Sequence, residues 1–226
     1  MEPVIGDLLP LAVGIAISPI PIIAVILMLF SDRAKSNGLA FLLGWALALF
    51  IVGGLALLLA NTQDLSEDGG EPSVLGSFIN LALGLLLLWL AVRQWRSRPK
   101  PREEPTMPAW MASIDTFTPV KALGLAALLS GVNPKNLALN LAAMATIAQA
   151  GLTGSGALVA LLVFVLLSSL SVGIPVIYYL LGGKSAQHTL DGWKTWLAAH
   201  NNAVMAVLLL VLGAKLLGSG IGGLIA

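Results

Sequence analysis

The chain has 226 residues, of which 58% are hydrophobic and 10% are charged, and its formal net charge is +1. This balance, with a mean hydropathy of +0.93, excludes an ordinary soluble domain and gives no indication of nucleic-acid binding. The absence of cysteine excludes disulfides, thiolate metal sites and dithiol redox chemistry. The two histidines, His188 and His200, fall in one connection, so we expect neither a metal site nor a cofactor. The composition predicts a single polytopic membrane domain, residues 1–226.

Six apolar segments follow one another along the chain, and each reaches the ~18 residues that indicate a transmembrane helix. The amino terminus, MEPVIGD, has no basic residue before the first segment and no small-residue cleavage site after it, so we expect this segment to be retained as a span. The fourth segment is too long for one straight crossing, which favours a broken helix over a strong tilt. The segments are residues 8–30, 38–60, 74–92, 122–150, 156–181 and 203–226.

The connections between these segments alternate in charge. The first and third contain Lys and Arg and the fifth contains Lys, whereas the second and fourth contain neither. The positive-inside rule therefore places the basic connections in the cytoplasm and both termini outside, with six crossings between them. The densest basic run, Arg93 to Arg102, is interpreted as a topology signal beside anionic lipid and not as a ligand site.

The chain divides into two halves, repeat 1 (8–92) and repeat 2 (121–226), joined by a basic, proline-punctuated cytoplasmic linker (93–120). Each half contains three predicted spans. Because three is odd, the second half must be inserted upside down relative to the first. The sequence therefore predicts two inverted-topology three-helix repeats.

Two proline sites occupy equivalent places in the halves, because a shift of 115 positions matches Ser18 with Asn133 and Pro19 with Pro134. Ser and Asn are preferred helix N-caps, and proline is favoured at the first helical position. Each site therefore predicts a helix that restarts inside a span, with spans 1 and 4 broken at Pro19 and Pro134. Backbone groups freed by such breaks cost several kcal/mol each in hydrocarbon, so the breaks belong in a protein interior or a cavity.

Lys135 adds a charge beside one of these restarted helices, whose N-terminal end is itself electropositive. A lysine near the middle of a span costs about 2.5 to 3.5 kcal/mol on insertion scales, so it should face a partner or water. No acidic residue lies within a predicted span core, which makes an anionic ligand the simplest partner. The alternative is that Lys135 snorkels or packs against carbonyl groups without a ligand. Asn136 and Asn140, four residues apart, share one helix face and join the candidate site, although interhelical hydrogen bonding also accounts for them.

Three features near the C-terminus have simpler interpretations. Lys215 lies near the middle or the outer end of the last span, and we place it at the outer interface. Trp193 and Trp196 indicate a short amphipathic cytoplasmic segment. Gly218 and Gly222, four residues apart, indicate close helix packing.

The stretch from Pro108 to Ala148, which includes SGVNPKNLALN, resembles the signature region of the GAP or Sap-like family. These are the peptidoglycolipid and sulfolipid addressing proteins of the wider LysE transporter superfamily. Elsewhere the resemblance rests on the six-span layout, Pro19 with Pro21, and the acidic outer loop. It implies a LysE-like fold, a place in the bacterial cytoplasmic (inner) membrane, a homodimer, and a part in moving lipids or glycolipids to the cell surface.

The resemblance extends to individual residues, because every residue of the family's sequence pattern is present in this chain. From the residues themselves, Thr118 and Pro119 are interpreted as the cap and first turn of span four, and Lys121 as the basic residue at the cytoplasmic end of this span. Asp115, with Lys121, is the candidate gating or proton-handling group, although Asp115 could equally cap a loop or pair with Lys121. The family pattern falls on Trp110, Asp115, Thr118, Pro119, Lys121, Asn133, Pro134, Lys135 and Asn136.

Three functions compete. The first is a transporter or exporter that moves an anionic lipid or glycolipid, or its precursor, across or out of the cytoplasmic membrane. The second is an exporter of a small solute such as an amino acid, and the third is a non-transporting scaffold for lipid-export machinery. An enzyme is not expected, because no nucleophile–base pair, catalytic carboxylate pair or phosphate-binding glycine motif is present. The candidate substrate-binding residues are Ser18, Pro19, Asn133, Pro134, Lys135, Asn136 and Asn140.

Overall fold

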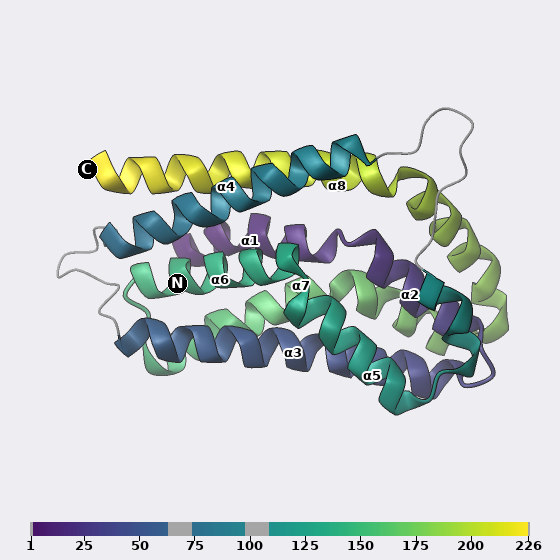
Figure 1. The fold of residues 1–226 in the computed structure, drawn as a ribbon. Helices are drawn as coiled ribbons and strands as arrows, with labels where there is room; N and C mark the ends of the chain where they lie inside the picture. The colour runs from purple at the N-terminus through teal and green to yellow at the C-terminus, as the bar shows by residue number, and fades with distance from the viewer. Residues whose placement is uncertain (1, 63–73, 98–108, 226) are drawn as a thin grey trace.

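The computed structural model describes residues 2–62, 74–97 and 109–225, and every regular element in these ranges is helical (Figure 1). The predicted all-α class is therefore confirmed. Most of the acidic outer loop, and the basic linker from residue 98 to 108, lie outside the described residues. The elements are α1 (Glu2–Ala16), α2 (Pro19–Phe30), α3 (Ala34–Thr62), α4 (Val74–Arg96), the 3₁₀ helix η1 (Ala109–Thr116), α5 (Pro119–Ala127), the π-helical turn η2 (Leu128–Val132), α6 (Pro134–Gln149), α7 (Gly154–Gly182), the 3₁₀ turn η3 (Gly183–Ala186) and α8 (Gln187–Ile225).

Three helical stretches in the described residues are long and apolar enough to cross a membrane, namely Ala34–Leu59, Val74–Arg96 and Gly154–Ile225. A fourth is added if α1 and α2, which are bent by 56° at their junction, count as one broken span. By length and composition, the protein is thus an α-helical membrane protein with three or four candidate spans.

The helix interruptions predicted at Pro19 and Pro134 are both present. The residue before each proline, Ser18 or Asn133, has an extended backbone, and the following helix begins at the proline. Proline is tolerated there because the first helical N–H has no partner within the helix, so its absence costs nothing. Both helix starts therefore follow from local sequence alone.

Helices α4 and α8 lie side by side and form the most extensive contact between two elements (Figure 1). Helices α1 and α6 lie between this pair and the layer that contains α3, and α7 packs against both α1 and α3. The core between them is filled by large side chains that are fully buried, including Phe41, Trp45 and Phe164.

Close approach of α4 and α8 depends on glycines, but not on those predicted. Gly218 and Gly222 have open space where a side chain would be, so assigning close packing to them was wrong. A Cβ on Gly220 would lie 2.8 Å from the backbone nitrogen of Leu81, and one on Gly84 would lie 2.8 Å from that of Leu217. Small residues let helix backbones approach in this way.

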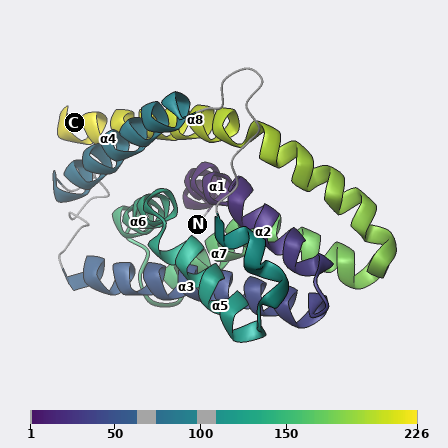
Figure 2. The same ribbon diagram turned by 45° about the vertical axis from the view of Figure 1, so that its right-hand side comes forward.

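The C-terminal helix α8 is continuous through the predicted amphipathic segment. Trp193 and Trp196 lie in its first turns, which run around the outside of the bundle before the helix turns back along α4 (Figure 2). Further along, the ammonium of Lys215 lies 3.5 Å from a carboxylate oxygen of Asp7 in α1. Because Asp7 is near the start of the chain, Lys215 lies toward the end of the molecule that carries both termini (Figure 1).

Candidate functional site

The break between α1 and α2 is held by the Ser18 side chain. Its hydroxyl donates a 2.6 Å hydrogen bond to the carbonyl of Ile15, so it binds the end of α1 and does not cap α2. At the start of α2, Pro19 and Pro21 have no N–H, and the N–H of Ile22 reaches the carbonyl of Ser18 at 3.3 Å. The helix start therefore presents few free donors, and its positive character comes mainly from the helix dipole.

The break before α6 is held by two asparagines. Asn133 caps α6 as predicted, because its side-chain oxygen accepts a 3.0 Å hydrogen bond from the backbone N–H of Lys135. The side-chain amide of Asn136 donates a 3.0 Å bond to the carbonyl of Leu129 in η2. Asn136 thus satisfies a backbone group at the end of the preceding turn.

Lys135 joins the two breaks. Its ammonium, on a residue that is 7% exposed, donates to the carbonyls of Gly14 at 2.8 Å and Ile17 at 3.3 Å and to the hydroxyl of Ser18 at 2.5 Å. These three bonds use the full donor capacity of a lysine ammonium. They also place the charge against the C-terminal carbonyls of α1, the negative end of that helix. Of the two interpretations of Lys135, packing against carbonyl groups is the one observed, so its charge needs no anionic ligand as partner.

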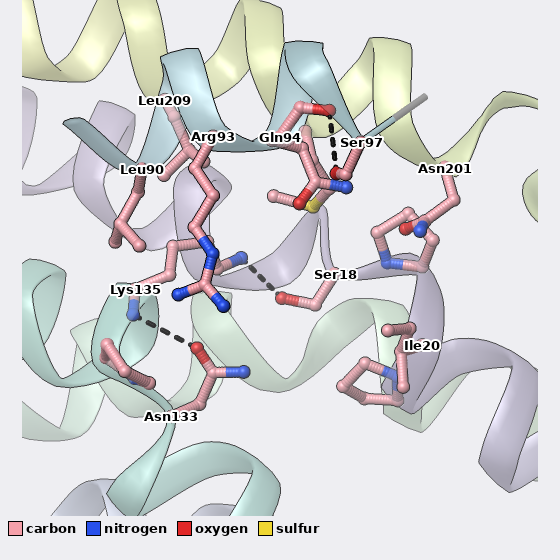
Figure 3. A pocket seen from close by; sticks show the side chains of 14 residues that line it. Ser18, Ile20, Leu90, Arg93, Gln94, Ser97, Asn133, Lys135, Asn201 and Leu209 are labelled. Carbon is pink, nitrogen blue, oxygen red and sulfur yellow. Dashed lines mark hydrogen bonds between the residues drawn. The ribbon is translucent and has the colours of Figure 1, made fainter. Parts of the chain in front are cut away.

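A cavity of about 420 Å³ opens beside these breaks, between the C-terminal end of α4 and the middle of α8 (Figure 3). Five of the predicted substrate-binding residues line it: Ser18, Pro19, Asn133, Pro134 and Lys135. The fold therefore brings together two sites that are 115 positions apart in the sequence.

Asn140, like Asn136, does not line this cavity. Its side-chain amide donates a 3.0 Å hydrogen bond to the carbonyl of Leu49 in α3. Both asparagines therefore make the contacts expected from interhelical and local packing, which was the alternative interpretation of this pair.

Residues of α4 and α8 complete the cavity, and sequence reasoning did not find them. Arg93 extends from the last turn of α4 into the cavity, toward the two helix breaks (Figure 3). Its guanidinium lies 5.5 Å from the centroid of the Trp89 ring, an arrangement that a cation–π attraction favours. The remaining members are Leu90, Gln94, Ser97, Asn201, Met205 and Leu209, with Ile20 and Pro21 of α2.

Interpreting Arg93 only as a signal of membrane topology therefore missed that its side chain lines the cavity. Its position at the last turn of an apolar span was the available signal, because a basic residue there can face inward as readily as toward lipid head groups. Gln94, next to it, donates a 3.0 Å hydrogen bond to Asn202, which in turn donates a 2.7 Å bond to the carbonyl of Ser97. These bonds fix the end of α4 against α8.

The charge of the cavity is positive. Arg93 and Lys135 both line it, no carboxylate of residues 2–62, 74–97 or 109–225 does, and α2 and α6 begin at it. The ion pairs within the described ranges join Lys194 to Asp191 and Lys215 to Asp7, so neither involves a cavity residue. Arginine and helix N-termini are both suited to binding carboxylate, phosphate or sulfate groups.

The predicted gating residues lie elsewhere. Asp115 is an exposed residue of η1, and Lys121 is exposed in the first turn of α5. Thr118 caps α5 as predicted, since its hydroxyl accepts from the backbone N–H of Lys121 at 3.4 Å. The side chain of Asn37 in α3 donates a 2.9 Å bond to the carbonyl of Phe117, which holds this connection against the bundle.

Interrupted helices around a cationic cavity, in a bundle with helices long enough to cross a membrane, define an α-helical membrane protein. The chain matches the family model described as Sap, sulfolipid-1-addressing protein, over residues 8–222, and it belongs to this family. The Sap part of the resemblance is therefore confirmed, and the family name indicates a lipid-related role. Comparisons with curated proteins and with solved structures give no match.

Proposed function

We propose that the protein is a transporter that moves an anionic lipid or glycolipid, or its precursor, across or out of the bacterial cytoplasmic membrane. The observation that carries this proposal is the placement of Arg93 beside Lys135 in one cavity to which the described residues contribute no carboxylate. Membership of the sulfolipid-1-addressing family supports an anionic lipid as the cargo. The proposed role is binding and translocation, with no bond made or broken.

The transporter architecture we propose is the predicted pair of inverted three-span repeats, as in the LysE superfamily. The contacts between helices support it. In this architecture α1 corresponds to α5, α2 to α6, α3 to α7 and α4 to α8. A contact in one repeat should then have a counterpart: α1–α7 should be matched by α3–α5, α2–α8 by α4–α6, and α3–α6 by α2–α7. All six of these contacts are present. Such a correspondence is what a two-fold relation between the repeats requires.

The number of crossings follows from the same assignment. The apolar stretch Gly154–Ile225 has 72 residues, whereas one crossing needs about 20. It is divided by η3, where Gly183 has a φ of 56° that L-residues rarely adopt. We therefore count α7 and α8 as separate spans and α5 through α6 as the second broken span, which gives six.

The proposed orientation has both termini outside. Figure 1 places both chain ends toward one end of the bundle, and the α2–α3 and α7–α8 connections at the other. The latter two carry Arg33 and Lys184, which favours the cytoplasm for that end. The cavity then lies between the helix breaks and the cytoplasmic end of α4, where a head group from the inner leaflet can enter.

Within this architecture, each cavity residue has a distinct proposed task. Lys135 holds the end of α1 against the start of α6 and so fixes the cavity wall. Arg93, which makes no ion pair with any residue that the structure describes, binds the head group, because a guanidinium can make two parallel hydrogen bonds to a phosphate or sulfate. Translocation would follow from rocking of one repeat against the other around this site.

Replacing Arg93 with glutamine tests the proposal. We expect transport of a labelled anionic lipid in proteoliposomes to fall by about 10- to 100-fold, because a charge-assisted hydrogen bond to the head group is lost. Arg96→Gln is the matched control, since Arg96 lies one turn further along α4 and does not line the cavity. Equal transport by wild-type and Arg93→Gln protein, with both correctly folded, would count against the proposal.

We also propose that Asp115, near Lys121, handles protons or gates the cytoplasmic entrance. If so, Asp115→Asn protein should lose the response of transport to an imposed pH gradient while keeping its gradient-independent rate. Asp32→Asn is the control, because Asp32 is another exposed carboxylate, in the α2–α3 connection. An unchanged response to the gradient would leave Asp115 with a loop-capping role only.

A small-solute exporter is the second candidate, and the size of the cavity favours it. A volume of about 420 Å³ falls in the range of about 300–1,000 Å³ that is typical of small-molecule sites. Uptake of labelled amino acids into inverted vesicles, without movement of labelled lipid in proteoliposomes, would select this candidate.

The third candidate, a scaffold for lipid-export machinery, predicts that the purified protein alone moves nothing. Its partner should then be recovered by affinity capture with wild-type protein and lost when the basic residues after Arg93 are neutralised. A homodimer is retained as a proposal, and the mass of the protein in detergent tests it.

A further inference from the structure

An apolar groove lies between α1 and α8. Its volume is about 610 Å³, and its walls include Val13 and Ile17 on α1 and Val204, Val207 and Val211 on α8. Within the part of the chain that the structure describes, every side chain that lines it is apolar. Val13 and Val207 are 48% and 57% exposed, so the groove is open and not filled by the protein's own core.

The groove and the cationic cavity meet at the break between α1 and α2. Ile17 lines the groove, and the next residue, Ser18, lines the cavity. The Lys135 ammonium binds the carbonyls of Gly14 and Ile17, two residues that line the groove, and the hydroxyl of Ser18, which lines the cavity. The charged cavity and the apolar groove thus adjoin at this break.

The groove has a defined length. On α8 it runs from Ala203 to Leu212, which at 1.5 Å per residue is about 15 Å. This is about half of the ~30 Å hydrocarbon core of a bilayer. Beyond its far end, the ion pair between Lys215 and Asp7 connects α8 to α1. The groove therefore matches the depth of one leaflet and is bounded by charge at both ends.

We propose that this groove holds an alkyl chain of the same anionic amphiphile whose head group enters the cavity. The inference rests on the proposed function and adds the apolar half of the site. Its basis is that the two hollows adjoin at Ile17 and Ser18, together with the change at that point from a cationic lining to one that is apolar among the described residues. The cavity recognises the head group, and the groove selects for an attached chain.

The test uses hexadecyl phosphate that carries a diazirine near the end of its chain, with the full-length protein in phosphatidylcholine nanodiscs. After photolysis, mass spectrometry locates the labelled peptides. We expect labelling to concentrate on the α1 and α8 segments that line the groove. Unlabelled hexadecyl phosphate should compete, and hexadecanol, which lacks the anionic group, should not.

Val207→Trp fills the groove and should lower labelling there by roughly tenfold, the factor that corresponds to losing about two buried methylene contacts. Leu210→Trp is the matched control, because Leu210 is 55% exposed on the same helix but does not line the groove. Its labelling should remain at the wild-type level. If Val207→Trp protein does not fold, Val13→Trp, on the opposite wall, makes the same test.

Two results would overturn the inference while leaving the proposed function standing. One is labelling spread evenly over lipid-facing helices, as bulk lipid would give. The other is an equal effect of Val207→Trp and Leu210→Trp. Failure of the proposed function is recognised separately, because labelling would then be insensitive to Arg93→Gln.

Discussion

Replacing Lys135 with methionine is expected to destabilise the protein by about 3 kcal/mol, the largest effect of any single side chain at the site. Methionine nearly matches the length of lysine but donates no hydrogen bond. The carbonyls of Gly14 and Ile17 and the hydroxyl of Ser18 would each lose a donor. In a water-poor interior these groups cannot be satisfied by solvent, so the cost is a desolvation penalty and not merely a lost contact.

The measurement is the midpoint of unfolding in detergent, by denaturant or by heat. Lys121→Met is the control, because Lys121 is exposed and only its backbone contributes to the α5 cap. A second variant, Ser18→Ala, should cost about 1 to 2 kcal/mol, since it removes one of the three partners and the bond to Ile15. Wild-type stability in Lys135→Met protein would show that these bonds do not hold the break.

This prediction also separates the two cations of the cavity. Lys135 is committed to the backbone of α1, so its removal should reduce stability first and transport as a consequence. Arg93 has no ion-pair partner among the described residues, so its removal should reduce transport with little change in stability. Measuring both quantities on both variants distinguishes a residue that builds the cavity from one that binds its ligand.

The helix breaks were predictable because their causes are local. Proline at the first helical position acts within a single turn, so Pro19 and Pro134 favour the starts of α2 and α6, and the Asn133 side chain caps the second. The same holds for Thr118 and Pro119 at the start of α5. The expectation that both breaks face the protein interior also followed from one local quantity, the cost of unsatisfied backbone groups in lipid.

The contribution of α4 and α8 was not predictable in the same way. Which side of α4 faces the cavity depends on how α4 packs against α8, so the basic residue Arg93 was indistinguishable from a topology signal. Gly218 and Gly222 show the same limit: their spacing is compatible with close packing, but Gly213 and Gly220 are the glycines that meet α4. Local patterns define faces of helices, and only the tertiary fold assigns each face a partner.

The second large effect is expected at Gly44, where α3 crosses α5. A Cβ on Gly44 would lie 2.9 Å from both the Cα and the carbonyl carbon of Leu123, and closer still to its oxygen. Because these are backbone atoms, no rotamer change can relieve the overlap, and α5 must move away from α3. We expect Gly44→Ala to destabilise the protein by about 2 kcal/mol, although alanine favours the helix by about 1 kcal/mol over glycine.

Gly54 provides the matched control, since it lies in the same helix and a Cβ added there would have no atom within 4 Å. Gly54→Ala should therefore be neutral or stabilising by up to about 1 kcal/mol, from helix propensity alone. Transport should fall in Gly44→Ala protein as well, because α5 leads through η2 to Asn133 and any shift of α5 displaces one wall of the cavity. Equal unfolding midpoints for the two alanine variants would mean that α3 and α5 are not in backbone contact. The contact with α3 could then not be what holds α5, and with it the helix break before α6, in place.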